Sequence, residues 1–121
     1  MEPKVIPDAQ AFRNRIEEPW GALNWLANAK LGNATGLTLG RVMIKAGCCN
    51  PRHAHFDCEE VLYLLSGELR HSFGDKEVLL KAGDTLWVPA GVFHHGVNIG
   101  TTEADMIVAY SSAHRDFVKE K

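Results

Sequence analysis

Three histidines and one glutamate in the middle of the chain have the types and spacing of metal ligands. His53 and His55 are two residues apart, so both side chains point to one face if this segment is extended. Glu60 follows at the start of an apolar run, and His94 follows a Pro-Ala-Gly turn. Three imidazoles and a carboxylate suit one divalent transition metal ion (iron, manganese, nickel, copper or zinc) and leave one or more coordination positions open.

The segments that must position these ligands have the pattern of β-strands. After Gly36 the sequence consists of short apolar and β-branched runs separated by glycine turns, and Gly74-Asp75 predicts a tight hairpin. No segment between the runs is long enough for a crossover helix. The pattern therefore predicts an all-β fold, an antiparallel β-barrel or jelly roll. The predicted strands are residues 37–45, 61–65, 68–73, 76–81, 85–88 and 105–110.

The N-terminal part of the chain has a different pattern. Residues 7–30 contain the only helical material, with a start at Pro7-Asp8 and an interruption at Pro19. With 121 residues, the chain is long enough for one hydrophobic core. We therefore expect a single domain, in which an N-terminal extension with a short helix (1–36) precedes a barrel with a C-terminal tail (37–121).

Two stretches of the sequence resemble the conserved motifs of the cupin superfamily. Residues 47–67 match the first motif, G(X)5HXH(X)3,4E(X)6G, and residues 83–98 match the second, G(X)5PXG(X)2H(X)3N, at every defined position. The spacing to Gly67 selects Glu60 as the ligand over its neighbour Glu59, and strand alternation turns Glu59 the other way. The resemblance implies a small single-domain cupin barrel whose metal ligands are His53, His55, Glu60 and His94.

The resemblance also limits the possible functions. A three-His, one-Glu site is similar to those of cupin dioxygenases if the ion is redox-active, and to those of cupin isomerases and lyases if it is not. Substrates would be small oxygen-rich molecules such as keto acids, diketones or sugar acids. The alternative is a non-catalytic cupin module that binds a small molecule or a sugar. Tyr110 and His114, in a tail faintly similar to that of cupins acting on unsaturated uronic acids, are candidate residues of the pocket mouth.

Other polar and aromatic residues have simpler interpretations. We expect His95 to point away from His94, and His71 to be exposed or to pack against a second subunit. Cys58 lies between two ligands, but a buried thiol is the simpler interpretation. Cys48 and Cys49 are expected to be unreactive loop thiols. Trp20 and Trp25 are expected to cover apolar surface at a barrel end or at an interface, and Trp87 is expected to be a packing residue.

Charge and hydropathy exclude several partners. The net charge is −2 and the Lys and Arg residues are scattered, so the sequence predicts no basic surface for binding nucleic acid. No apolar run is long enough to cross a membrane and the N-terminus lacks a signal peptide, so we expect a cytoplasmic protein, in keeping with an odd number of cysteines. A barrel this small leaves open sheet edges and outward apolar side chains such as Val61, Tyr63 and Leu65, which predicts a homodimer.

Overall fold

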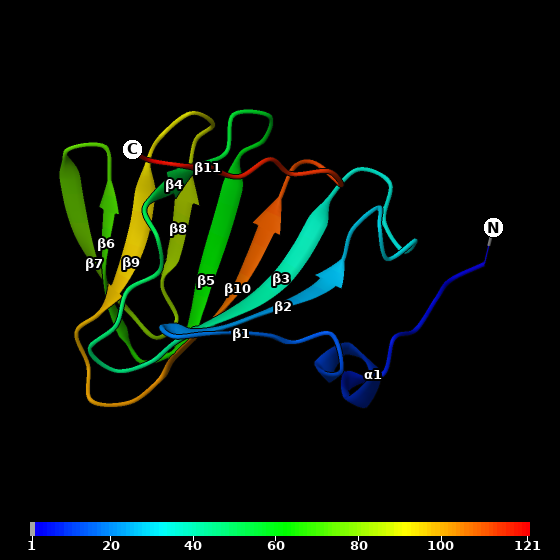
Figure 1. Cartoon of the computed structure of the whole chain (residues 1–121), viewed down its shortest axis with the longest axis horizontal. Helices are drawn as coiled ribbons and strands as arrows, with labels where there is room; N and C mark the ends of the chain where they lie inside the picture. The colour runs from blue at the N-terminus through cyan, green and yellow to red at the C-terminus, as the bar shows by residue number, and fades with distance from the viewer. Residues whose placement is uncertain (1) are drawn as a thin grey trace.

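The computed structural model describes residues 2–121, which form two antiparallel sheets facing each other (Figure 1). The six strands of the larger sheet are, in spatial order, β1 (Ile16–Glu18), β2 (Gly21–Ala27), β3 (Thr38–Ile44), β10 (Ala104–Tyr110), β5 (Glu60–Ser66) and β8 (Thr85–Val88). The smaller sheet contains β11 (Val118–Lys119), β4 (His53–Ala54), β9 (His94–Asn98), β6 (Glu68–Phe73) and β7 (Lys76–Lys81). The predicted all-β jelly roll is confirmed.

Strand alternation decides which side chains enter the core. In β5, Leu62 and Leu64 are buried while Val61 and Tyr63 face outward, and in β10 every second residue from Ala104 to Tyr110 is buried. These inward residues pack against the facing sheet, for example against Leu69 of β6. Burying one such side chain stabilises the fold by about 1.5–3 kcal/mol.

The N-terminal region corrects the expectation of helix over residues 7–30. Only α1 (Asp8–Phe12) is helical, and β1 and β2 follow it as strands of the larger sheet. The expected boundary at residue 36 therefore falls inside this sheet, between β2 and β3. Residues 21–27 form a strand because β2 pairs with β3, antiparallel to it from Gly21↔Ile44 onward. No helix in the described part of the chain is long and apolar enough to span a membrane.

Two glycines allow close contacts around the larger sheet. Gly67 joins β5 to β6 with φ of 91°, a conformation that favours glycine, and a Cβ there would lie 2.8 Å from the Cα of Ala104. Gly40 on β3 lies under the indole of Trp25, where a Cβ would come within 2.6 Å of the ring. Trp25 can therefore lie flat against β3, at one end of the barrel interior.

Candidate metal centre

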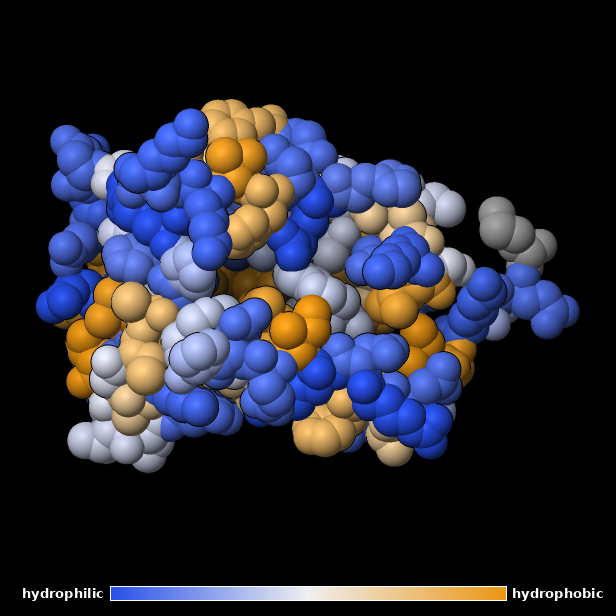
Figure 2. Space-filling view, viewed as in Figure 1, coloured by the Kyte–Doolittle hydropathy of each residue, from blue (hydrophilic) through white to orange (hydrophobic). Residues whose placement is uncertain are grey.

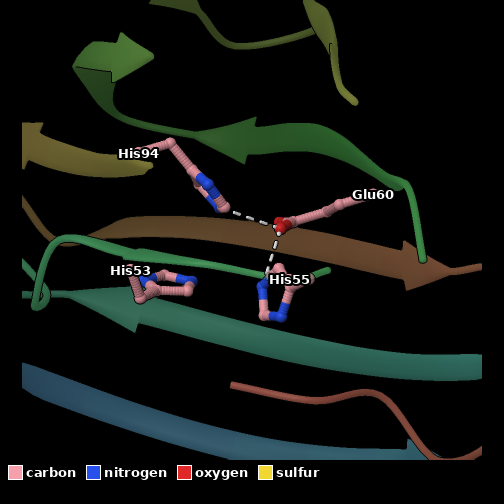
Figure 3. Close-up of side chains that lie close together, drawn as sticks. All are labelled: His53, His55, Glu60 and His94. Carbon is pink, nitrogen blue, oxygen red and sulfur yellow. Dashed lines mark hydrogen bonds and ion pairs between the residues drawn. The ribbon is translucent and has the colours of Figure 1, made fainter. Parts of the chain in front are cut away.

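The four predicted ligands come from both sheets and meet inside the barrel. His53 on β4 is directly opposite His94 on β9 in the smaller sheet, whereas Glu60 begins β5 in the larger sheet and His55 follows β4. Figure 3 shows the four side chains converging. Their ligand atoms all lie within 4.8 Å of one another, and each residue is at most 6% exposed.

The outer nitrogen of each histidine ring is fixed by a backbone carbonyl. The Nδ1 atoms of His53, His55 and His94 lie 2.7, 2.5 and 3.0 Å from the carbonyl oxygens of Pro51, Asp116 and Val92, respectively. Because a carbonyl only accepts hydrogen bonds, each Nδ1 must carry the proton and donate it. In the neutral rings, every Nε2 therefore presents a lone pair, the form that binds metal.

These lone pairs face the carboxylate of Glu60. The contacts within this donor set show whether a metal ion fits. Glu60 Oε1 lies 3.0 Å from His94 Nε2 and 3.4 Å from His55 Nε2, and His55 Nε2 has no hydrogen-bond partner although it is buried. Two lone-pair nitrogens and an anionic oxygen repel one another unless a proton or a metal ion lies between them. The cluster can therefore hold a divalent metal ion, as the donor set predicts.

The charge states of the cluster favour metal binding. Burial lowers the pKa of His53 to about 4, so this ring is neutral at physiological pH. Burial opposes the charge of Glu60, but its contacts with His55 and His94 outweigh that effect and lower the pKa of the carboxyl to about 2. Burial likewise opposes protonation of His94, yet the neighbouring Glu60 raises the pKa of this ring. An ionised Glu60 beside a neutral His53 is the state that a metal ion requires.

A cavity of about 330 Å³ opens onto the cluster. His53, Glu60 and His94 lie in its wall, most of the remainder being apolar and including Trp20 and Trp25. Figure 2 shows a recess near the middle of this face with hydrophobic residues at its floor. The C-terminal segment and β1 border the cavity through Phe117 and Ile16. The site is thus a largely apolar cavity with three of the four candidate metal ligands in its wall.

The structure separates the two candidate residues of the pocket mouth. Tyr110, at the end of β10, is buried and lines this cavity. Burial raises the pKa of its phenol well above the usual value, and Glu60 raises it further, so the phenol keeps its proton. His114 is exposed and lies on a second cavity, whereas its neighbour Arg115 lines the first. Sequence reasoning missed Arg115.

Other residues near the cluster lie as expected, except for His71. Glu59 is exposed and accepts a hydrogen bond of 2.9 Å from Trp87 Nε1, so it points away from the ligands. Burial raises the pKa of Cys58 to about 12, which leaves it an unreactive thiol. His95 is half-buried, with Nδ1 2.5 Å from the hydroxyl of Ser72.

His71 corrects an expectation. It is only 2% exposed and stacks on His94, with ring centroids 5.6 Å apart, where an exposed or interface residue was predicted. The signal was available in the sequence, since His71 lies two residues after the apolar Leu69 in the same strand and must share its inward face.

Comparisons with known proteins identify the family. The model of the cupin domain matches residues 40–110, and the chain belongs to this family. It is similar to oxalate oxidase 2 of Hordeum vulgare (33% identity over 88 residues, 66% of this chain and 39% of that protein) and to the putative germin-like protein 3-4 of Oryza sativa subsp. japonica (34%, 66% and 38%). The chain spans about two fifths of the length of these curated relatives.

Solved structures agree with this assignment. A structure of oxalate oxidase superposes with a TM-score of 0.76 at 28% identity, covering 85% of this chain and 57% of that one. A mutant of the Bacillus subtilis oxalate decarboxylase OxdC gives a TM-score of 0.84 at 20% identity, covering 91% of this chain and 31% of the other. The second likeness supports the fold alone.

Proposed function

We propose that this protein is a metal-dependent cupin enzyme that holds one divalent ion with His53, His55, Glu60 and His94 and acts on a small carboxylate-bearing substrate. The carrying observation is the convergence of three Nε2 atoms and a carboxylate at the base of a cavity. The relatives include oxalate oxidase 2 of Hordeum vulgare, and the structurally similar Bacillus subtilis oxalate decarboxylase has Mn(II) centres. These names favour manganese and a carboxylate ligand.

The residues of the cavity have separate roles in this proposal. A bound ion would supply Lewis-acid polarisation of substrate oxygens, and one-electron chemistry if it is manganese or iron. The backbone carbonyls at Nδ1 hold the three imidazoles in the metal-binding tautomer. The apolar walls exclude water, and the protonated phenol of Tyr110 can donate a hydrogen bond to a substrate oxygen.

Cavity size favours a substrate larger than a minimal dicarboxylate. About 330 Å³ lies at the lower end of the range of roughly 300–1,000 Å³ that accommodates organic ligands. Most of the lining is apolar, so a fully polar molecule would lose hydrogen bonds to water over much of its surface. The substrate therefore combines a chelating carboxylate or keto acid with an apolar body.

Metal analysis followed by a turnover assay tests this proposal. The protein is purified anaerobically without chelators, its metal content is measured, and oxygen uptake and product formation are followed with oxalate, keto acids, diketones and uronates. We expect close to one transition metal ion per chain and turnover of a carboxylate, both lost in His53→Ala. Oxygen uptake would indicate oxidase or dioxygenase chemistry, and turnover without it an isomerase or lyase. Binding without any turnover would overturn the enzyme proposal in favour of a small-molecule-binding module.

We also propose that two copies of the chain form a homodimer through the outer face of β5 and β8. Val61, Tyr63 and Leu65 of β5 point outward and are about two fifths exposed, and Trp87 of β8 lies opposite Val61 and is 61% exposed. Aromatic side chains of this kind are enriched in protein interfaces. Because β8 is an edge strand, a second copy would also cover unpaired backbone groups.

A further inference from the structure

A second cavity, of about 280 Å³, adjoins the metal-site cavity. Trp25, Arg115 and Phe117 line both cavities, so these side chains stand between them. Apart from Arg115, the charged or titratable side chains of its lining are Lys30 and His114, and no carboxylate is present there. The second cavity is thus a basic compartment whose wall is shared with the metal-site cavity.

Arg115 is held by aromatic rings and not by acids. Its guanidinium carbon lies 3.9 Å from the ring centroid of Trp25 and 5.2 Å from that of Tyr110. Within residues 2–121, its side chain has no ion pair or side-chain hydrogen bond, whereas the four arginines that do form ion pairs bond to carboxylates, namely Arg15, Arg41, Arg52 and Arg70. Stacking on a ring face leaves the N–H edges of a guanidinium available.

The donors of Arg115 are therefore available to an anionic acceptor. The guanidinium of Arg115 is half-buried and its donors lack acceptors. Because less water competes at such a position, binding of an ionised acceptor is more favourable there than at an exposed guanidinium. Lys30 and His114 add positive or polar groups to the same compartment, and the amide of Asn28 lies beside them. Carboxylates and phosphate monoesters both fit the planar fork of arginine.

We infer that the second cavity binds an anionic group, a carboxylate or a phosphate monoester, on the end of the substrate remote from the metal ion. A ligand bound to an ion held by His53 and Glu60 can extend along the apolar wall to Arg115, which lines this cavity and the second one. The substrate would then have two polar ends and an apolar middle. The connection to the substrate rests on the proposed function, but the anion site itself does not.

Chain-matched ligands test the anion site independently of the metal. Binding of octanoate, octyl phosphate and 1-octanol to the full chain after chelator treatment is measured by isothermal titration calorimetry. We expect at least one of the two anions to bind about tenfold more tightly than the alcohol, and the tighter one identifies the preferred group. Arg115→Gln should abolish this preference, and Arg115→Lys should retain part of it. Arg70→Gln, which removes a paired arginine from β6, serves as the matched control and should change nothing.

Two results would overturn the inference: no preference for either anion over the alcohol, or an unchanged preference in a folded Arg115→Gln variant. A second comparison separates it from the proposed function. In the metal-loaded protein, octanedioate should bind about tenfold more tightly than octanoate, and Arg115→Gln should remove this advantage. If the chelator-treated protein prefers anions but the loaded protein does not favour the dicarboxylate, the anion site stands and substrate binding at the metal ion fails.

Discussion

The ring of Phe117 lies stacked on that of His53, with centroids 4.6 Å apart and planes inclined by 24°. The same segment pairs Lys119 with His53 through β11 and β4, and the carbonyl of Asp116 accepts from Nδ1 of His55. In Figure 1 this segment runs along the upper ends of the larger sheet's central strands. The C-terminal segment therefore orients two of the four candidate ligands.

Removing the Phe117 ring should weaken metal binding without unfolding the barrel. An aromatic pair contributes about 0.5–1.5 kcal/mol, so we expect Phe117→Ala to lower the affinity for Mn²⁺ or Co²⁺ about three- to tenfold. Calorimetric titration of the chelator-treated protein measures the change. Phe12→Ala, on the exposed helix α1, is the matched control and should bind as the wild type does. Equal affinity in the two variants would show that Phe117 does not support His53.

Removing the charge of Glu60 should abolish metal occupancy, whereas the same change at Glu59 should not. Glu60 is buried among the histidines, while Glu59 bonds to the indole of Trp87 at the surface. The metal content per chain is measured after purification of Glu60→Gln and Glu59→Gln. The two variants carry the same chemical change at adjacent positions. Loss of metal in Glu59→Gln with full occupancy in Glu60→Gln would show that the carboxylate is wrongly assigned.

The metal-free protein should lose stability as pH falls from about 6.5 to about 4. Burial lowers the pKa of His71 to about 4, so the unfolded chain takes up a proton in this range while the folded chain does not. At pH 5, this one residue should cost about 2 kcal/mol relative to pH 7. Above the pKa of His71 in the unfolded chain, the contribution of this residue to the free energy of unfolding does not change with pH.

Urea unfolding at pH 7 and pH 5 measures this effect. His71→Gln should reduce the loss of unfolding free energy between the two pH values by about 2 kcal/mol, and His53, whose pKa is lowered in the same way, should contribute to the remaining loss. His114→Gln, at an exposed position, should leave the loss unchanged. An identical loss in His71→Gln and wild type would exclude His71 as a source.

A charge in the outer face of β5 should separate the proposed dimer. Tyr63→Lys places an ammonium among exposed apolar side chains, where a partner would have to desolvate it. Light scattering coupled to size exclusion should give a dimer for the wild type and a monomer for this variant. Leu79→Lys, on β7 of the other sheet, changes an apolar side chain that is even more exposed than Tyr63, and this variant should remain dimeric. A monomeric wild type at micromolar concentration would end the proposal.

The candidate ligand set could be predicted from the sequence because motif spacing and strand alternation are local. His53 and His55 lie two residues apart and share a face, whereas Glu60, on the facing sheet, was identified through its spacing in the first cupin motif. The structure then brings His94 to them through a single register pair, His53↔His94. The alternation that separates Glu60 from Glu59 is equally local.

What the sequence could not show depends on contacts between distant segments. Residues 16–27 become strands because β3 is available beside them, which overrides their local pattern. Asp116 contacts His55 across a separation of 61 residues, and no periodicity in the tail predicts that contact. Arg115 was missed for the same reason, since its place on the ring of Trp25 depends on where the tail crosses the barrel.

Strand β10 lies between β3 and β5 and joins parts of the chain that are far apart in sequence. Its end is fastened by a hydrogen bond from Thr38 to Ser112, which spans 74 residues. The entropy of closing such long loops is lost before the contacts that offset it can form, which makes folding slow. Barrels of this kind refold in milliseconds to seconds. Because the four ligands meet only once both sheets have formed, added metal ion should leave the refolding rate unchanged and slow unfolding instead.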